Sequence, residues 1–183
     1  MKMNNVTSKN IKVGVAVDLP PNLPTTFQYI KFEVTDNNGN SLTTVGDISY
    51  VIGGQNYPSS AMTGFATPGV EEVYDYSSYY QNNSTYEPWK AFDNLTYTNN
   101  RWLFDSSFPQ FVSLDLSSSY NTSDFGYIKI LPGNHNADDY TDRAIKDFNV
   151  YISDDNETWY SILEETEVTE WESGVEKIFY INF

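Results

Sequence analysis

The stretch Gln110-Phe111-Val112-Ser113-Leu114-Asp115-Leu116 alternates apolar and polar side chains, which is the pattern of a β-strand with one buried face. Further stretches alternate in the same way, and each is short and bounded by Asn, Asp, Gly or Pro: residues 29–34, 47–52, 127–131, 148–152 and 177–183. No window of about ten residues carries an apolar stripe at helical spacing. The sequence therefore predicts an all-β fold, a β-sandwich of the jelly-roll type.

The length and the aromatic content fit a single strand-rich domain with an N-terminal arm. The 183 residues suffice for one substantial core, and 16% of them are aromatic, a class of residue that strands favour. Residues 1–26 are expected to form an extended arm or linker, because an alternating run at residues 11–17 is followed by Pro20, Pro21 and Pro24. Residues 27–183 are expected to form the sandwich.

The chain is strongly acidic, with a formal net charge of −15. Nucleic acid is an unfavourable partner, because only 10 Lys and Arg are present to neutralise phosphates. The acidity fits two alternatives, a solvated acidic surface or carboxylates gathered at a Ca²⁺ site. No stretch reaches the roughly 18 apolar residues of a membrane span, so membrane insertion is not expected. The N-terminal residues lack the apolar core of a signal peptide, and cysteine is absent.

Three motifs occur in one order along the chain. The first is Ala91-Phe92-Asp93-Asn94 followed by Thr98 and Arg101-Trp102, the second is residues 108–116, and the third is residues 146–159. Together they resemble the "A-F-D-G/N…T…W" loop, the "P-Q-W-I-x-V-D-L" strand and the "K-x-F-x-V-x-x-S-x-D-G-x-x-W" hairpin of discoidin domains. This resemblance implies a galactose-binding-like jelly roll, the fold of many carbohydrate-binding modules.

The chain departs from the discoidin pattern in its loop, its turn and its ends. Trp102 lies two residues later than usual, and Asn156 replaces the turn glycine, a change that left-handed backbone at Asn tolerates. The closing strand that carries a Glu in that family is missing downstream. A similar pair of strands lies at the front, where residues 29–34 and 45–50 flank an Asn38-Gly39 turn of the kind that hairpins need. We infer a permuted arrangement with the final hairpin moved to the front, which is similar to modules of phage tail and fibre proteins.

The resemblance implies a structural Ca²⁺ in the loop that follows residue 89. Asp93 and Thr98 offer side-chain oxygens, and the backbone carbonyls of Lys90, Asn94 and Thr98 are further candidates. Under the permutation, Asp47 takes the place of the closing-strand Glu. The alternative is that Asp93 and Thr98 only cap backbone amides in the loop.

Sugar recognition is expected on loops at one end of the sandwich, where aromatic side chains and planar polar groups read sugar faces and hydroxyls. The candidates in and near the loop at residues 132–143 are Asn134, His135, Tyr140 and Arg143, with Tyr79, Tyr80, Trp102 and Phe104 on neighbouring loops. His135 also fits an ordinary exposed loop residue, and Arg143 also fits an ion pair with Asp139 or Asp142. Trp89 and Trp159 are expected in the core.

Three functions are compatible with these patterns. The first is a non-catalytic glycan-binding module with a structural calcium ion, in a virion (tail, fibre or head decoration) or outside the cell. The second is a purely structural virion protein whose N-terminal arm adds a strand to another virion protein. The third, a hydrolase, is disfavoured because adjacent acids such as Asp154-Asp155 point to opposite faces of a strand, and no hydrolase motif is present. We therefore expect no enzymatic activity.

Overall fold

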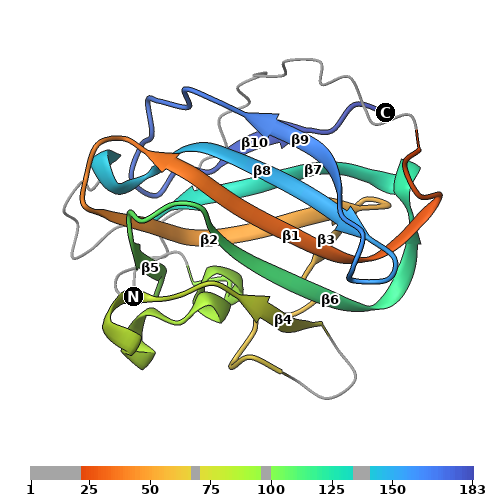
Figure 1. Ribbon diagram of the computed structural model, residues 1–183, viewed down its shortest axis with the longest axis horizontal. Helices are drawn as coiled ribbons and strands as arrows, with labels where there is room; N and C mark the ends of the chain where they lie inside the picture. Colours follow the sequence, from red (N-terminus) through yellow and green to blue (C-terminus); the bar gives the residue numbers. More distant parts are fainter. Residues whose placement is uncertain (1–21, 67–70, 96–99, 134–140) are drawn as a thin grey trace, which may run out of the picture.

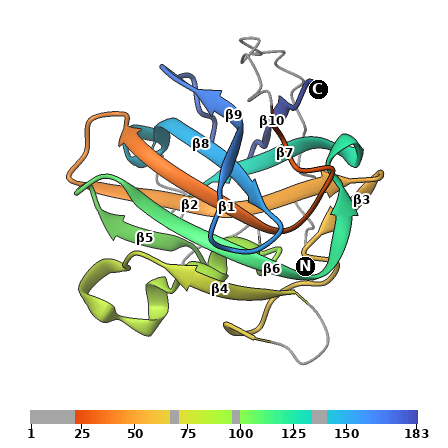
Figure 2. The same cartoon turned by 45° about the vertical axis from the view of Figure 1, so that its right-hand side comes forward.

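The computed structural model describes residues 22–66, 71–95, 100–133 and 141–183, which form two antiparallel five-stranded sheets packed face to face (Figures 1 and 2). Sheet B has the order β4 (Glu72–Tyr76), β6 (Gln110–Asn121), β1 (Thr26–Asn37), β8 (Ile145–Ser153) and β9 (Tyr160–Glu165). Sheet A has the order β10 (Lys177–Tyr180), β7 (Phe125–Pro132), β2 (Leu42–Ile52) and β3 (Gln55–Tyr57), and β5 (Trp102–Asp105) also pairs with β2. The predicted all-β sandwich is confirmed. The predicted arm lies outside the described residues as far as residue 21.

Short 3₁₀ helices connect the strands: η1 (Tyr80–Asn82), η2 (Ser84–Tyr86), η3 (Pro88–Phe92), η4 (Thr122–Asp124) and η5 (Thr141–Arg143). None of the helices in the described parts of the chain has the length and apolar character needed to cross a bilayer. The first three lie near β4 and β5 in the lower part of Figure 1.

The core lies between the two sheets and is built by the alternation read from the sequence. In β1, Ile30, Phe32 and Val34 point inward and are fully buried, and opposite them on β8 lie the equally buried Phe148 and Val150. Aromatic rings pack side by side on this inner face of sheet B, where the ring centroids of Phe32 and Phe148 are 5.2 Å apart. Burying large aromatic and branched side chains is the main stabilising contribution to such a sandwich.

The predicted hairpin at the front of the chain is wrong. β1 pairs with β6 and β8, whereas β2 pairs with β7, β3 and β5, so the two strands belong to different sheets. The turn with Gly39 at a φ of +104° carries the chain across the sandwich. Asn37 Nδ2 donates to Thr43 Oγ1 at 2.9 Å and Ser106 Oγ at 2.7 Å, which fixes the corner between the sheets instead of a two-residue hairpin.

The second predicted hairpin is confirmed. β8 and β9 pair antiparallel, and the turn between them places Asn156 at a φ of +61°. Asp155 Oδ1 accepts the backbone N–H groups of Glu157 and Thr158, both at 2.8 Å. Local side-chain chemistry therefore determines this turn.

The two tryptophans expected in the core lie elsewhere. Trp89 is half-buried at the edge of the core, and its Nε1 donates to Glu87 Oε2 at 2.7 Å. Trp159 is half-buried beside the outer face of sheet B, where Lys31 Nζ lies 4.5 Å from its ring centroid. The expectation of core burial is wrong for Trp159, because the β8–β9 turn directs its ring toward the outward-facing Lys31.

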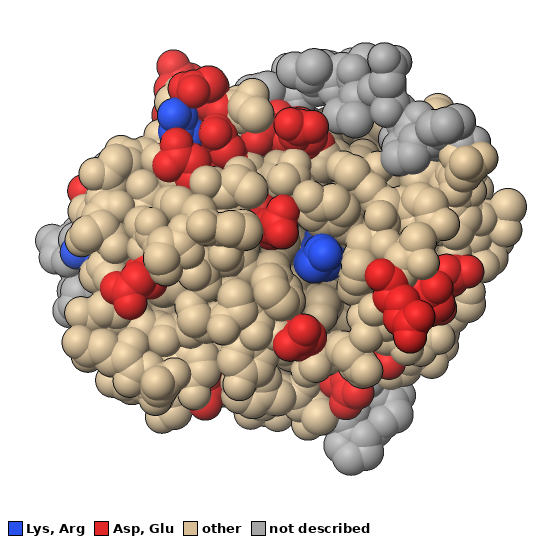
Figure 3. Space-filling view, in the orientation of Figure 1, with Lys and Arg blue, Asp and Glu red and all other residues tan. Residues whose placement is uncertain are grey.

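The acidic side chains on the face of sheet B form separate small groups, with uncharged surface between them and a basic side chain near the middle (Figure 3). This distribution on the visible face fits a solvated acidic surface that keeps the particle soluble. It does not account for the carboxylates that the fold buries.

Candidate functional site

The edge of β2 has a gap in its strand pairing, and η3 fills it. β5 pairs with Leu42–Val45 and β3 pairs with Tyr50–Ile52, so within the described residues the stretch 46–49 has no strand partner on that edge. η3 packs against β2 there, and its Phe92 carbonyl accepts the N–H of Met62 at 2.9 Å. The turn that follows η3 is thereby placed beside the middle of β2.

A bulge at Gly46 directs Asp47 to the outer face of sheet A, which is the face turned away from sheet B. Val45 and Ile48 both point into the core, so the alternation of β2 skips one position between them, where its register against β7 shifts. A Cβ at Gly46 would lie 2.8 Å from the Pro132 carbonyl oxygen, so only glycine fits this close approach. With regular alternation, Asp47 would share the inner face with Val45.

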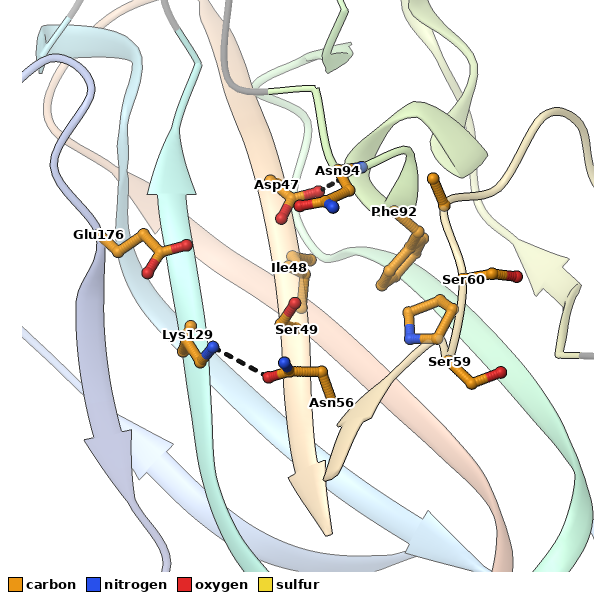
Figure 4. Close-up of a pocket in the computed structure, with 12 residues that line it drawn as sticks. Asp47, Ile48, Ser49, Asn56, Ser59, Ser60, Phe92, Asn94, Lys129 and Glu176 are labelled. Atoms are coloured by element: carbon orange, nitrogen blue, oxygen red, sulfur yellow. Dashed lines mark hydrogen bonds between the residues drawn. The ribbon is translucent and has the colours of Figure 1, made fainter. Parts of the chain in front are cut away.

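Two carboxylates lie close together here, that of Asp93 in the turn after η3 and that of Asp47 on β2. Asp47 Oδ1 accepts the backbone N–H of Asn94 at 3.1 Å, and Asp93 Oδ1 accepts the N–H of Leu95 at 2.9 Å (Figure 4). Asn94 takes a φ of +55°, a left-handed conformation that Asn tolerates better than most residues. Asp47 is 5% exposed and Asp93 is 4% exposed. The chain therefore buries two acids at one point, each with one N–H donor among the described residues.

Burial raises the pKa of Asp47 to about 8. The Asn94 N–H opposes this shift, because it stabilises the ionised form. The negative charges of Asp93 and Glu176 raise the pKa of Asp47 further, and the Lys129 ammonium lowers it. In the absence of a bound cation, Asp47 is therefore protonated at neutral pH.

Burial also raises the pKa of Asp93, to about 6. The Leu95 N–H and the nearby Lys90 charge oppose the shift. Within the described residues, neither Asp47 nor Asp93 forms a salt bridge. A cation bound between the two acids would remove the cost of keeping them ionised in this buried position.

The structure brings together Asp47, Asp93, Asn94 and Lys90 of the predicted calcium set, while Thr98 lies outside the described residues. No group of three or more His, Cys, Asp or Glu side chains in the described ranges is placed to hold a metal ion. Two carboxylates would therefore need backbone carbonyls, amide oxygens or water to complete a Ca²⁺ shell. The capping alternative also has support, because Asp93 accepts the N–H two residues on, as in an Asx turn.

A pocket of about 180 Å³ opens over the outer face of sheet A beside Asp47 (Figure 4). Strands β2, β7 and β3, the loop after β3, the turn after η3 and the residue before β10 surround it. Lys129 Nζ on β7 donates to Asn56 Oδ1 on β3 at 2.9 Å, across the outer face of β2. The polar lining residues are Asp47, Ser49, Asn56, Ser59, Ser60, Asn94, Lys129 and Glu176.

Two of the residues expected to contact sugar are core residues. Trp102 and Phe104 are both 0% exposed, and their ring centroids lie 4.3 Å apart. Trp102 Nε1 donates to the Ser78 carbonyl at 2.9 Å, so the segment before η1 covers the ring. The expectation of ligand contact is wrong for both, because β5 is covered on both faces and a buried ring offers no platform to a ligand.

The other predicted end-loop residues are only partly described. Asn134, His135 and Tyr140 lie outside the described residues. Arg143 lies half-buried in η5, and Tyr80 is half-buried with its ring centroid 6.1 Å from that of Tyr86. Tyr79 is half-buried and packs against the core. A second cavity of about 280 Å³ lies at the same end as η5 and includes Asn38, Thr141, Asp142, Glu170 and Trp171.

Several residues at these sites are not evident from the sequence. Arg101 is buried, and its guanidinium carbon lies 5.3 Å from the ring centroid of Tyr86. Lys129 and Asn56 meet only because β7, β2 and β3 adopt one particular register. In the sequence, only the outward position of Lys129 in an alternating strand indicates that its side chain is available to the pocket.

Comparison with known proteins found no matching family model, no matching curated protein and no matching solved structure.

Proposed function

We propose that this chain is a non-catalytic glycan-binding module in which Asp47 and the turn at residues 90–94 hold a structural Ca²⁺. The observation that supports calcium is the burial of two neighbouring carboxylates, Asp47 and Asp93, neither of which forms a salt bridge within the described residues. Calcium is the cation of choice, because every side chain offered at this point presents oxygen rather than imidazole or thiolate.

The ion would act on stability rather than on chemistry. It would join β2 to the turn after η3, two segments that are 46 residues apart at Asp47 and Asp93. Since Ca²⁺ binds only where the fold brings the two acids together, binding would stabilise the folded state. The acid pair at Asp154 and Asp155 is explained without catalysis, because Asp155 holds the β8–β9 turn and backbone N–H donation lowers its pKa to about 2.

Glycan recognition is supported by the polar pocket beside Asp47 and by the discoidin-like motifs. The pocket offers hydroxyl, amide, ammonium and carboxylate groups in one hollow, which is the mixture that reads sugar hydroxyls. The two front strands lie in different sheets, so the proposed setting, a virion or another extracellular one, rests on the discoidin-like motifs rather than on a permuted hairpin. The N-terminal arm would then contact other virion proteins.

A glycan array probed with the full chain, in Ca²⁺ and in EDTA, tests this function. Binding to a set of glycans that weakens in EDTA supports it, because loss of the ion loosens the turn beside the pocket. The Asp47→Asn/Asp93→Asn double variant should bind alike in Ca²⁺ and in EDTA, whereas the matched control Asp155→Asn should respond as the unaltered chain does. No binding to any glycan in Ca²⁺ would overturn the proposal in favour of a purely structural virion protein, and turnover of a glycoside would overturn its non-catalytic part.

A further inference from the structure

We infer that the pocket over the outer face of sheet A, lined by Asn56, Lys129 and Glu176, is the subsite for one neutral sugar residue of a glycan. This inference rests on the proposed glycan binding and places it on a sheet face, away from the end loops expected from the sequence. Asp47 lies beside Asn94 at one end of the group of lining residues (Figure 4), and Pro58 and Ala61 also line the pocket.

The size of the pocket fits a single sugar ring. A volume of about 180 Å³ corresponds to roughly six water molecules at about 30 Å³ each. A ring carrying several hydroxyl groups replaces about that much water and returns most of its hydrogen bonds. A longer oligosaccharide would have to extend from the pocket mouth over the surface.

The lining offers hydrogen-bond donors and acceptors side by side. Lys129 uses one of its three N–H groups on Asn56 Oδ1, which orients the Asn56 amide with Nδ2 as a donor. Glu176 is an acceptor, and Ser49 and Ser60 supply hydroxyls that act in either sense. Sugar hydroxyls also donate and accept, so a rim of this mixed character suits them better than it suits a purely anionic or cationic ligand.

The charges within the pocket favour a neutral ligand. Glu176 repels an acidic sugar or a phosphate, and the Lys129 ammonium repels an amine. The net charge of −15 on the chain adds to the first effect. Asp47 adds no net charge, since it is neutralised by a proton or by the proposed Ca²⁺. The apolar side of a neutral ring can rest on Pro58 and Ala61, which leaves its hydroxyl edge for the polar groups.

The test is a titration of the Ca²⁺-saturated full chain with a panel of neutral methyl hexopyranosides. Binding is monitored through the amide chemical shifts in NMR spectra. We expect at least one glycoside to shift the Asn56 side-chain amide and the backbone amides of residues 47–49. Asn56→Ala should weaken that binding at least about fivefold, since one hydrogen bond is lost, and Glu176→Gln should weaken it less. Both positions lie at the surface of the sheet, and a thermal melt of each variant verifies its fold.

The matched control is Tyr74→Ala on sheet B, where Tyr74 is 53% exposed on the opposite face of the molecule. It should leave the affinity unchanged. If a glycoside binds but Asn56→Ala and Glu176→Gln bind it as tightly as the unaltered chain, the subsite lies elsewhere and only this inference fails. If the methyl uronide of the same sugar binds more tightly than the neutral glycoside, the neutral assignment fails. If the chain binds no glycan on the array either, the proposed function fails with it.

Discussion

Two of the places where the described residues bury acid do so in opposite ways. On the outer face of sheet A, Asp47 and Asp93 lie together, each accepts one backbone N–H, and a polar pocket opens beside them. On the inner side of sheet B, Glu165 lies opposite Phe148 at the edge of the core and is 1% exposed. Within the described residues its Oε1 atom has no hydrogen-bond partner.

The difference separates an arrangement suited to a ligand from one that only costs stability. Burial raises the pKa of Glu165 to about 7, and no neighbouring charge contributes. A lone buried acid responds by staying protonated, since no ion can reach it among apolar side chains. The Asp47–Asp93 pair has donors already in place and access to solvent through the pocket. A bound cation can therefore offset the cost of ionising Asp47 and Asp93, but it cannot do so for Glu165.

The largest expected effect is a fall in stability as the pH rises in Ca²⁺-free buffer. Folding raises the pKa of Asp47, Asp93 and Glu165, so the folded chain holds protons that the unfolded chain releases. Stability is therefore greatest near pH 4 and is lost between pH 4 and pH 8, with about 3 kcal/mol from Glu165 alone. Urea unfolding at intervals of one pH unit measures this. A free energy of unfolding that rises from pH 5 to pH 8 would contradict the burial of these acids.

Calcium should remove part of that pH dependence. At a free concentration one hundred times its dissociation constant, a bound ion adds about 2.7 kcal/mol at pH 7.5, which raises the melting temperature by roughly 5–10 °C for a chain of this length. Asp47→Asn and Asp93→Asn should each abolish the increase, and Glu165→Gln should retain it. Melting curves with Ca²⁺, Mg²⁺ and EDTA provide the comparison. Identical melting curves in Ca²⁺ and in EDTA would show that Asp47 and Asp93 only cap backbone N–H groups of the turn.

A substitution at Glu165 should act only on the second region. Glu165→Gln removes the cost of ionising a buried acid, so at pH 8 we expect it to stabilise the chain by about 2 kcal/mol. At pH 5, where Glu165 is protonated when folded, the effect should be within about 0.5 kcal/mol. The same urea titrations measure both values. An equal effect at the two pH values would show that Glu165 is not a titrating buried group.

Local patterns predicted the strands and the β8–β9 turn, while contacts between distant segments escaped prediction. The alternation at residues 110–116 and 148–152 is a property of each strand, and the Asp155–Asn156 turn is held by the Asp155 side chain, which accepts backbone N–H groups of the same turn. The turn at Gly39 looks like a hairpin, but whether the next strand joins the same sheet depends on partners elsewhere. The burial of Trp102 likewise depends on the segment at residues 77–92, which alternation cannot place.

The candidate site was predictable only in part, and for the same reason. The nearness of Asp47 to the turn after η3 was expected from the discoidin resemblance, and the hydrogen bond to Asn94 N–H agrees with it. The pocket was not predicted, because Lys129 and Asn56 meet through the register of three strands. The sequence does indicate the burial of Glu165. It follows the apolar Leu163 by two residues, and side chains two apart in a strand share a face.

The smallest effect tests whether the turn after η3 depends on its backbone or on the Asn94 side chain. Asn94 contributes its N–H to Asp47 and takes a φ of +55°. Asn94→Gly keeps that N–H and adopts this φ without strain, so it should change the free energy of unfolding by less than about 0.5 kcal/mol. Asn94→Val forces a β-branched residue into the left-handed region and should cost about 1–2 kcal/mol.

The matched control for Asn94 is Asn156, which has a φ of +61° in the β8–β9 turn, far from the acid pair. Asn156→Gly and Asn156→Val should show the same small and larger losses of stability, because the backbone requirement is the same. Only Asn94→Val should also reduce the Ca²⁺-dependent rise in melting temperature, since it moves the N–H that holds Asp47. If Asn156→Val reduces that rise equally, the ion is not bound at the Asp47–Asp93 pair, and the contrast between the two buried acidic regions reduces to a difference in hydrogen bonding.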